Sequence, residues 1–234
     1  MPAHPLPRDM PSSDPSDDLR DISTRWSEVK DIDRFVLRYT DAMMRFLSLV
    51  IGDDDVARDV LQSFLLKIIQ RGFRDDLPGG GKFRDYLAKS LRNAAIDHFR
   101  SRKMVSLEPS HWQNLQSRWD DCEDLWRRQW TECLLDRAWE HLDRFQYSRA
   151  DSIAHDVLRY ATENPDQSVA QAARTLGDTL RRDITPDAYR QQLSRARKRF
   201  AEYLIAEIRQ TLSSPDEANV RDEAAALGLS RYVT

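Results

Sequence analysis

The chain has 234 residues, of which 40% are hydrophobic and 32% are charged, and its formal net charge is −3. This length suffices for one large domain or two small ones, and the composition is that of a globular protein with a highly charged surface. No apolar run is long enough to span a bilayer, and the N-terminus lacks the apolar segment of a secretory signal. We therefore expect a cytoplasmic protein with no membrane partner. Glycine is scarce and runs of β-branched residues are rare, which favours an all-α fold.

Positive charge is concentrated in two segments, although the whole chain is acidic. Residues 82–103 contain seven Lys or Arg against two Asp, and residues 187–199 contain five against one. Acidic residues collect elsewhere, in 14–18, 53–55, 120–124 and 216–223. Two basic patches on an acidic chain suit a protein with two nucleic-acid contacts and a separate protein partner.

The first elements in chain order are a tail and two helices. Five prolines fall within the first 15 residues, so we expect a disordered tail over 1–20. Apolar residues at steps of three and four then predict a helix from about Trp26 to Val50. The run Gly-Asp-Asp-Asp at 52–55 ends this helix and supplies carboxylates to the start of the next, expected over 54–71.

A third helix is expected from about Lys82 to Arg102, after a loop over 72–81 that contains Pro78 and three consecutive glycines. Beside its apolar seam, this helix carries cations with aromatic rings interleaved. A melted nucleic-acid strand requires cations for its phosphates and flat rings for its bases. For the helix alone, the simpler interpretation is an amphipathic helix with a solvated basic face.

Tryptophan recurs around the segment 104–122, which we expect to be a linker. Trp112, Trp119 and Trp126 are seven residues apart, and Trp130 is four further on. On a helix this spacing makes an aromatic stripe, for which core packing is the simpler interpretation. A contact with a partner or with the first domain is the alternative, because exposed Trp is unfavourable unless it binds something.

The two cysteines, Cys122 and Cys133, are 11 residues apart on a predicted helix. That separation is about 16 Å along the helix axis at the helical rise per residue, which is too far for a disulfide. The sequence has no Cys-x-x-Cys motif and no nearby group of histidines, so zinc is not expected. We predict two plain thiols, partly buried.

The second half is predicted to be helical over 123–147, 150–162 and 168–176, with Gly177 as a natural helix stop. The tripeptide Thr185-Pro186-Asp187 predicts a helix start, with Thr as the cap and Pro in the first turn. This last helix is expected to run to about Leu212.

The helices over 168–176 and 186–208 form a candidate helix-turn-helix. The segment 178–184 between them is longer than the usual turn of three or four residues, so either the turn is long or the first helix resumes after Gly177. A basic helix that caps a bundle is the alternative. The residues expected to contact duplex DNA are Asp187, Arg190, Gln191, Ser194, Arg195, Arg197 and Lys198.

No catalytic motif is present: the sequence lacks a P-loop, an HExxH motif and a nucleophile elbow. The five histidines are scattered. We expect no enzyme activity, no metal, no cofactor and no small-molecule substrate.

Three strings carry a resemblance to a known family. They are DVLQSFLLK at 59–67, GKFRDYL at 81–87 and LRNAAIDHFRSRK at 91–103. Together they resemble region 2 of the bacterial extracytoplasmic-function sigma factors, in a planctomycete-like variant. The string LSRARKRF at 193–200 is similar to the end of the recognition helix in region 4 of that family.

The resemblance implies two small helical domains and an alternative sigma factor that binds core RNA polymerase and recognises promoter DNA. Asp59, Gln62 and Ser63 would contact polymerase, with Ser63 where the family commonly has Glu. The helix over 82–103 would hold the melted −10 strand, and 186–199 would bind the −35 duplex. In the −10 segment the expected contacts are Lys82, Phe83, Arg84, Tyr86, Lys89, Arg92, Asn93, Asp97, His98 and Arg100.

The expected organisation has five parts: a tail over 1–20, a first domain over 21–103, a linker over 104–122, a second domain over 123–212 and a polar tail over 213–234. A frayed helix is one alternative for this last segment.

Two other functions stay open. One is a stand-alone helix-turn-helix regulator, which needs no polymerase-binding face, and the other is a helical protein-interaction adaptor. The sequence leaves open whether an anti-sigma factor binds and whether the acidic tails compete for the basic patches.

Overall fold

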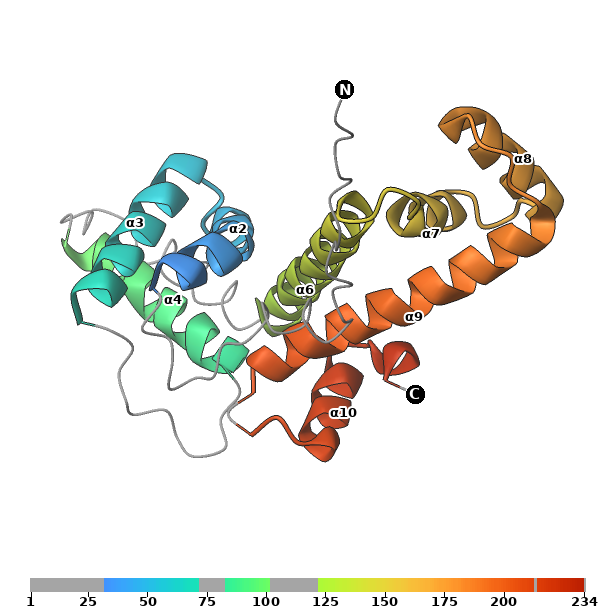
Figure 1. Cartoon of the computed structure of the whole chain (residues 1–234). Helices are drawn as coiled ribbons and strands as arrows, with labels where there is room; N and C mark the ends of the chain where they lie inside the picture. The colour runs from blue at the N-terminus through green and yellow to red at the C-terminus, as the bar shows by residue number, and fades with distance from the viewer. Residues whose placement is uncertain (1–31, 72–82, 102–121, 213, 234) are drawn as a thin grey trace, which may run out of the picture.

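The computed structural model describes residues 32–71, 83–101, 122–212 and 214–233, and the regular structure in these ranges is entirely helical. The all-α prediction is therefore confirmed. The helices are α2 (Ile32–Ile51), α3 (Asp54–Arg71), α4 (Phe83–Ser101), α6 (Cys122–Tyr147), α7 (Ala154–Glu163), α8 (Val169–Leu180), α9 (Pro186–Gln210), α10 (Glu217–Ala226) and the short 3-10 helix η2 (Ser230–Tyr232) (Figure 1). None of the helices in these ranges combines the length and the hydropathy that crossing a bilayer requires.

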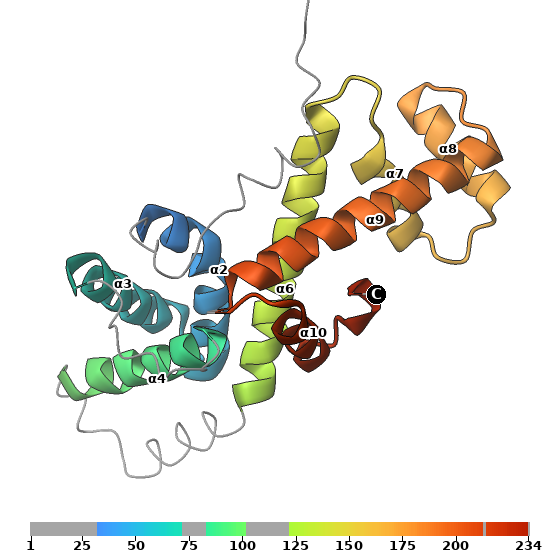
Figure 2. The same cartoon turned by 60° about the horizontal axis from the view of Figure 1, so that its bottom comes forward.

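Helices α2, α3 and α4 gather at one side of the molecule (Figures 1 and 2). Their buried side chains include Met43, Leu47 and Leu87, which are the apolar residues that the helical spacing predicts to face inward. Gly52 adopts a positive φ of 76° and ends α2, as its sequence context predicts. The Asp53 carboxylate then accepts hydrogen bonds from the backbone nitrogens of Asp55 and Val56 and caps α3.

Helix α6 packs against both α2 and α9. At its N-terminal end, Trp130 stacks on Tyr39 of α2, with ring centroids 4.9 Å apart, and Trp126 meets Phe46 edge-on at 5.0 Å. Both tryptophans are buried against α2, which lies in the predicted first domain, so core packing and the contact with the first domain coincide for these two. Trp112 and Trp119 lie outside the described residues. Cys122 and Cys133, also on α6, are buried thiols.

The C-terminal half of α6 packs along α9. Trp139 contacts Phe200 with ring centroids 4.8 Å apart, and His141 Nε2 lies 2.9 Å from a carboxylate oxygen of Glu207. Glu207 is fully buried, so this contact supplies a partner for a carboxylate in the interior. We expected helix α6 to belong to the second domain alone. Its side chains instead pack against α2 near one end and against α9 near the other.

Helix α8 differs from its predicted extent. A capping box formed by Ser168 and Gln171 starts it where expected, but it runs through Gly177 to Leu180 and ends at Arg181, whose φ is 53°. The sequence left two alternatives for 178–184, a long turn or a first helix that resumes after Gly177. The structure has the second, because α8 continues to Leu180. Gly177 is inside the helix and is not its stop.

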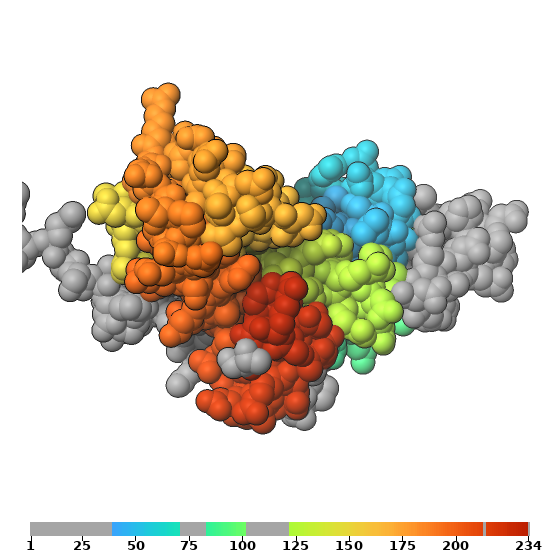
Figure 3. Space-filling model, turned by 90° about the vertical axis from the view of Figure 1, so that its right-hand side faces the viewer, coloured from blue at the N-terminus to red at the C-terminus, as the bar shows by residue number. Residues whose placement is uncertain are grey.

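The segment expected to be a polar tail contains a capped helix. The Asp216 carboxylate accepts a hydrogen bond from the backbone nitrogen of Asn219 at the start of α10. Val220 and Ala224 are buried, and α10 packs against the C-terminal half of α9, as the red and orange surfaces in Figure 3 show. The acidic composition of this segment concealed a helix whose few apolar residues share one face.

Candidate functional site

The first candidate surface is the exposed side of α3, which we call the α3 face: Asp59, Gln62, Ser63, Leu66 and Ile69. At 100° per residue these positions fall within about a third of the helix circumference, so they form one stripe. Gln62 and Ser63 are exposed and Asp59 is half-buried. The structure thus brings the three predicted polymerase contacts together.

Sequence reasoning missed Leu66 and Ile69. They are 56% and 53% exposed, among the few large hydrophobic side chains in the described residues that lie so far in solvent. A signal for them existed, because both fall off the stripe of α3 that packs on the core and yet are apolar. Exposed apolar residues grouped beside polar ones are typical of a protein-binding surface.

The second candidate surface is on α4, where the ten predicted strand contacts divide into interior and exterior residues. Phe83 packs against Tyr39 and Trp130, with ring centroids 5.7 and 6.0 Å away, and His98 is also buried. These two rings belong to the core in this structure. Tyr86 is half-buried and lies parallel to Phe83 at 6.5 Å, and Lys82 is outside the described residues.

Four of the ten residues are exposed along one stripe of α4, which we call the α4 strip: Lys89, Asn93, Asp97 and Arg100. Arg92 is half-buried beside them. The Asp97 carboxylate lies 3.3 Å from Lys67 Nζ on α3, and both side chains are more than half exposed. This contact places the α4 strip next to α3.

Arg84 has a different environment from the rest of the predicted strand contacts. Its guanidinium is buried and pairs with Glu223 of α10, and its Nε lies 3.2 Å from the Asp85 carboxylate. Its backbone oxygen accepts a hydrogen bond from the Trp126 indole at 2.8 Å. In this conformation Arg84 is held within the protein.

The third candidate surface is the exposed side of α9, which we call the α9 face. It consists of the seven predicted duplex contacts, all exposed: Asp187, Arg190, Gln191, Ser194, Arg195, Arg197 and Lys198. They lie opposite the buried Tyr189, Ala196 and Phe200. The structure therefore brings all seven to one side of the first half of α9.

Charge on the α9 face is positive, with four cations against one carboxylate. That carboxylate, Asp187, lies 2.5 Å from Arg190, and both side chains are largely exposed. Exposed pairs of this kind contribute little to stability, so an incoming phosphate can replace the carboxylate. Behind the face, burial raises the pKa of the Tyr189 phenol, with Tyr160 raising it further and Arg197 opposing the shift.

The start of α9 is fixed by local chemistry. The Thr185 hydroxyl accepts from the backbone nitrogen of Ala188, and Pro186 occupies the first turn, as the sequence predicts. The turn before it is anchored at a distance, because the Arg182 guanidinium donates to the backbone oxygens of Ala150 and Asp151 at 3.0 and 3.4 Å.

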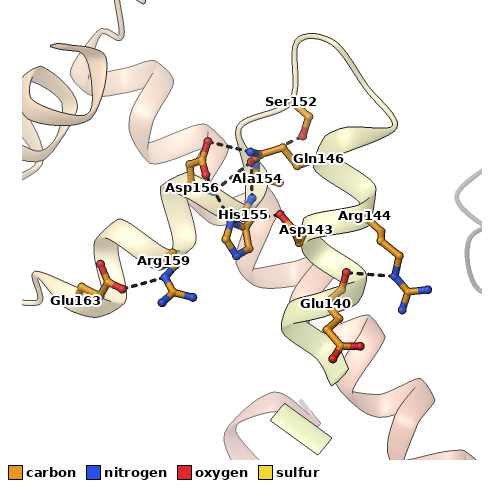
Figure 4. A network of polar contacts seen from close by, with 10 residues as sticks. All are labelled: Glu140, Asp143, Arg144, Gln146, Ser152, Ala154, His155, Asp156, Arg159 and Glu163. Atoms are coloured by element: carbon orange, nitrogen blue, oxygen red, sulfur yellow. Dashed lines mark hydrogen bonds and ion pairs between the residues drawn. The ribbon is translucent and has the colours of Figure 1, made fainter. Parts of the chain in front are cut away.

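One amide side chain of α6 caps helix α7, which leads into α8. The N-cap residue of α7 is Ile153, which has no capping oxygen. The Gln146 side-chain oxygen instead accepts from the backbone nitrogens of His155 and Asp156, and its nitrogen donates to the Asp156 carboxylate at 2.8 Å (Figure 4). The end of α6 therefore caps α7 and sets the direction in which α8 and α9 follow.

No cluster of His, Cys, Asp and Glu that could hold a metal ion occurs within the described ranges. Comparison with protein-family models, with curated proteins and with solved structures found no match.

Proposed function

We propose that this chain is an alternative sigma factor that binds core RNA polymerase and directs it to promoter DNA. The observation that carries the proposal is the presence, in one chain, of two exposed faces with different chemistry. The α9 face is cationic and polar, whereas the α3 face is partly apolar. A duplex-binding helix and a separate protein-binding helix are what a promoter-specificity subunit requires.

The α9 face suits duplex DNA. It belongs to a helix that follows α8 after a short turn, and its side chains project away from the core. Arg190 and Gln191 near its N-terminus are residue types that bind guanine and adenine edges with two hydrogen bonds. Arg195, Arg197 and Lys198 are positioned one to two turns later, where phosphate contacts are expected.

The α3 face favours a sigma factor over a stand-alone regulator, which would have no need of it. Leu66 and Ile69 offer apolar area, and Asp59 and Gln62 offer hydrogen-bonding groups beside it. The resemblance of the string at 59–67 to the polymerase-binding part of sigma region 2 supports the same assignment. The α4 strip lies next to α3 and would contact the melted strand.

A pull-down with bacterial core RNA polymerase tests the proposal. We expect the wild-type chain to bind, and the double change Leu66→Ala/Ile69→Ala to weaken binding at least about tenfold, as for central apolar contacts of an interface. The matched control is Leu49→Ala, a leucine on α2 that is 55% exposed. Binding of duplex DNA without binding of polymerase would favour the stand-alone regulator, and binding of neither would favour the adaptor.

A further inference from the structure

The contact between Arg84 and Glu223 joins two segments that are 139 residues apart in the sequence. The side chain of Arg84 is 10% exposed and that of Glu223 is 2% exposed, so the pair is shielded from solvent. Removing two charges from water is unfavourable, and a hydrophobic pair at the same place would often be at least as stable. Stability alone therefore does not account for the burial of this pair.

Glu223 reaches this position because α10 is fixed on α9. Val220, Ala224, Leu227 and Leu229 are buried, and Tyr232 in η2 contacts Phe200 of α9 with ring centroids 5.8 Å apart. The other side of α10 carries exposed charges, including Glu217 and Arg221. The segment 214–233 thus contacts α9 with its apolar side and α4 through one carboxylate.

A carboxylate and a phosphate present the same chemistry to arginine. The guanidinium donates two parallel N–H groups to either anion, and such charge-assisted pairs are strong. Glu223 therefore occupies the group on α4 that would bind a backbone phosphate of a nucleic acid. While it does so, Arg84 is unable to bind a strand.

We propose that α10 is an intramolecular inhibitor of single-stranded nucleic-acid binding by α4, with Glu223 in the place of a phosphate. Release of α10 would expose Arg84 at the N-terminal end of α4, five residues before Lys89 of the α4 strip. The inference rests on the strand-binding role given to α4 under the proposed function, and it adds the device that regulates that role.

The strength of the inhibition depends on the fraction of molecules in which α10 is released, which we call the open form. If α10 is released in about a tenth of the molecules, the apparent affinity for a strand is about tenfold weaker than that of the open form. A change that weakens the contact raises the open fraction and the apparent affinity by up to that factor.

Fluorescence anisotropy with a labelled single-stranded oligonucleotide of roughly 16 nucleotides, about one binding site, measures the apparent affinity. We expect Glu223→Gln to raise the affinity several-fold. Adding Arg84→Gln to that variant should remove the gain, because the exposed group would no longer bind phosphate. The matched control is Glu217→Gln, which removes one carboxylate from the exposed side of the same helix and should leave the affinity unchanged.

A second measurement uses the unaltered chain, so it does not depend on how a variant folds. Hydrogen exchange of the α10 amides, 217–226, is compared with and without a saturating concentration of the same oligonucleotide. We expect exchange at α10 to rise when the strand binds, since strand and helix compete for Arg84.

Two results would overturn the inference and are distinct from each other. If the oligonucleotide binds while α10 stays protected and Glu223→Gln has the wild-type affinity, α10 does not inhibit, and the proposed function is unaffected. If neither the wild-type chain nor Glu223→Gln binds the oligonucleotide at any concentration, the strand-binding role of α4 fails and the inhibitory role fails with it.

Discussion

The backbone oxygen of Arg182 lies so close to Gly177 that a Cβ at residue 177 would be 2.7 Å from it. Gly177 is in the helical region of α8 and its own oxygen accepts a hydrogen bond from the backbone nitrogen of Arg182 at 2.9 Å. The chain therefore turns back across this residue after α8, and only a residue without a side chain permits that path. The close approach brings α9 into its position after α8.

We expect Gly177→Ala to destabilise the protein. In an open helix this change would stabilise by about 1 kcal/mol through helix propensity, but here the added methyl meets a backbone oxygen that has no rotamer with which to move away. Overpacking of this kind costs about 1–3 kcal/mol, so we expect a net loss in the free energy of unfolding, measured by urea denaturation. Arg174→Ala, an exposed change on the same helix, is the control, and a Gly177→Ala variant as stable as this control would contradict the account.

Trp130 tests whether α6 joins the two halves. It is fully buried and stacks on Tyr39, so Trp130→Ala should cost about 3–5 kcal/mol. We expect the wild-type chain to unfold in a single transition that is the same by circular dichroism and by tryptophan fluorescence. In the variant, this single transition should shift as a whole toward lower stability. Two wild-type transitions, of which only one responds to the change, would show that the halves fold independently.

Asp216 gives the stability of α10 a pH dependence with a defined sign. Hydrogen bonds from the backbone of Asn219 and from neighbouring groups lower the pKa of this carboxyl below its usual value. A lowered folded-state pKa means that the ionised cap stabilises α10 at neutral pH and that this contribution is lost as the pH falls through the folded pKa. We expect hydrogen exchange of α10, corrected for the intrinsic rate, to increase in that acidic range.

The control for this pH effect is Asp216→Asn, which keeps a capping oxygen but does not titrate. In that variant the rise in α10 exchange at acidic pH should be smaller. Identical acid profiles for the two proteins would assign the effect to other carboxylates.

The α9 face should contribute to DNA affinity mainly through phosphates. Changing both Arg195 and Lys198 to Ala should weaken duplex binding across sequences and reduce the slope of log K against log salt by about 1.8, at roughly 0.9 per phosphate contact. The control is Arg159→Ala/Arg221→Ala, two exposed arginines on α7 and α10. An unchanged slope would show that Arg195 and Lys198 do not contact phosphates.

Helix positions were predictable because apolar spacing and capping residues are local signals. Helices α3, α4, α6 and α9 begin and end within two residues of their predicted bounds, and Thr185 and Gly52 act as predicted. The seven residues of the α9 face were predictable for the same reason, since position along a helix defines which side a residue occupies.

Phe83 falls on the apolar seam that the helical spacing predicts, and it is buried as that spacing indicates. The interior positions of Arg84 and His98 were not predictable from local signals. A cation between Phe83 and Asp85 on a basic helix gives no indication of a buried partner, and Glu223 lies in a segment whose composition is that of a tail. The role of Gly177 was missed because the backbone path of the turn after α8, which brings the Arg182 oxygen close to this residue, is not visible in the spacing of residue types. The buried positions of Arg84 and His98 depend on tertiary packing, which local spacing does not encode.

The central claim is that this chain gives RNA polymerase a promoter preference, and run-off transcription with core polymerase over a library of promoter fragments measures it directly. We predict transcripts from defined start sites that depend on the chain and that are reduced by Asp59→Ala, a change that should leave the circular dichroism spectrum unaltered. The claim would be contradicted if no transcript depended on the chain. This holds whether or not the same preparation binds core polymerase.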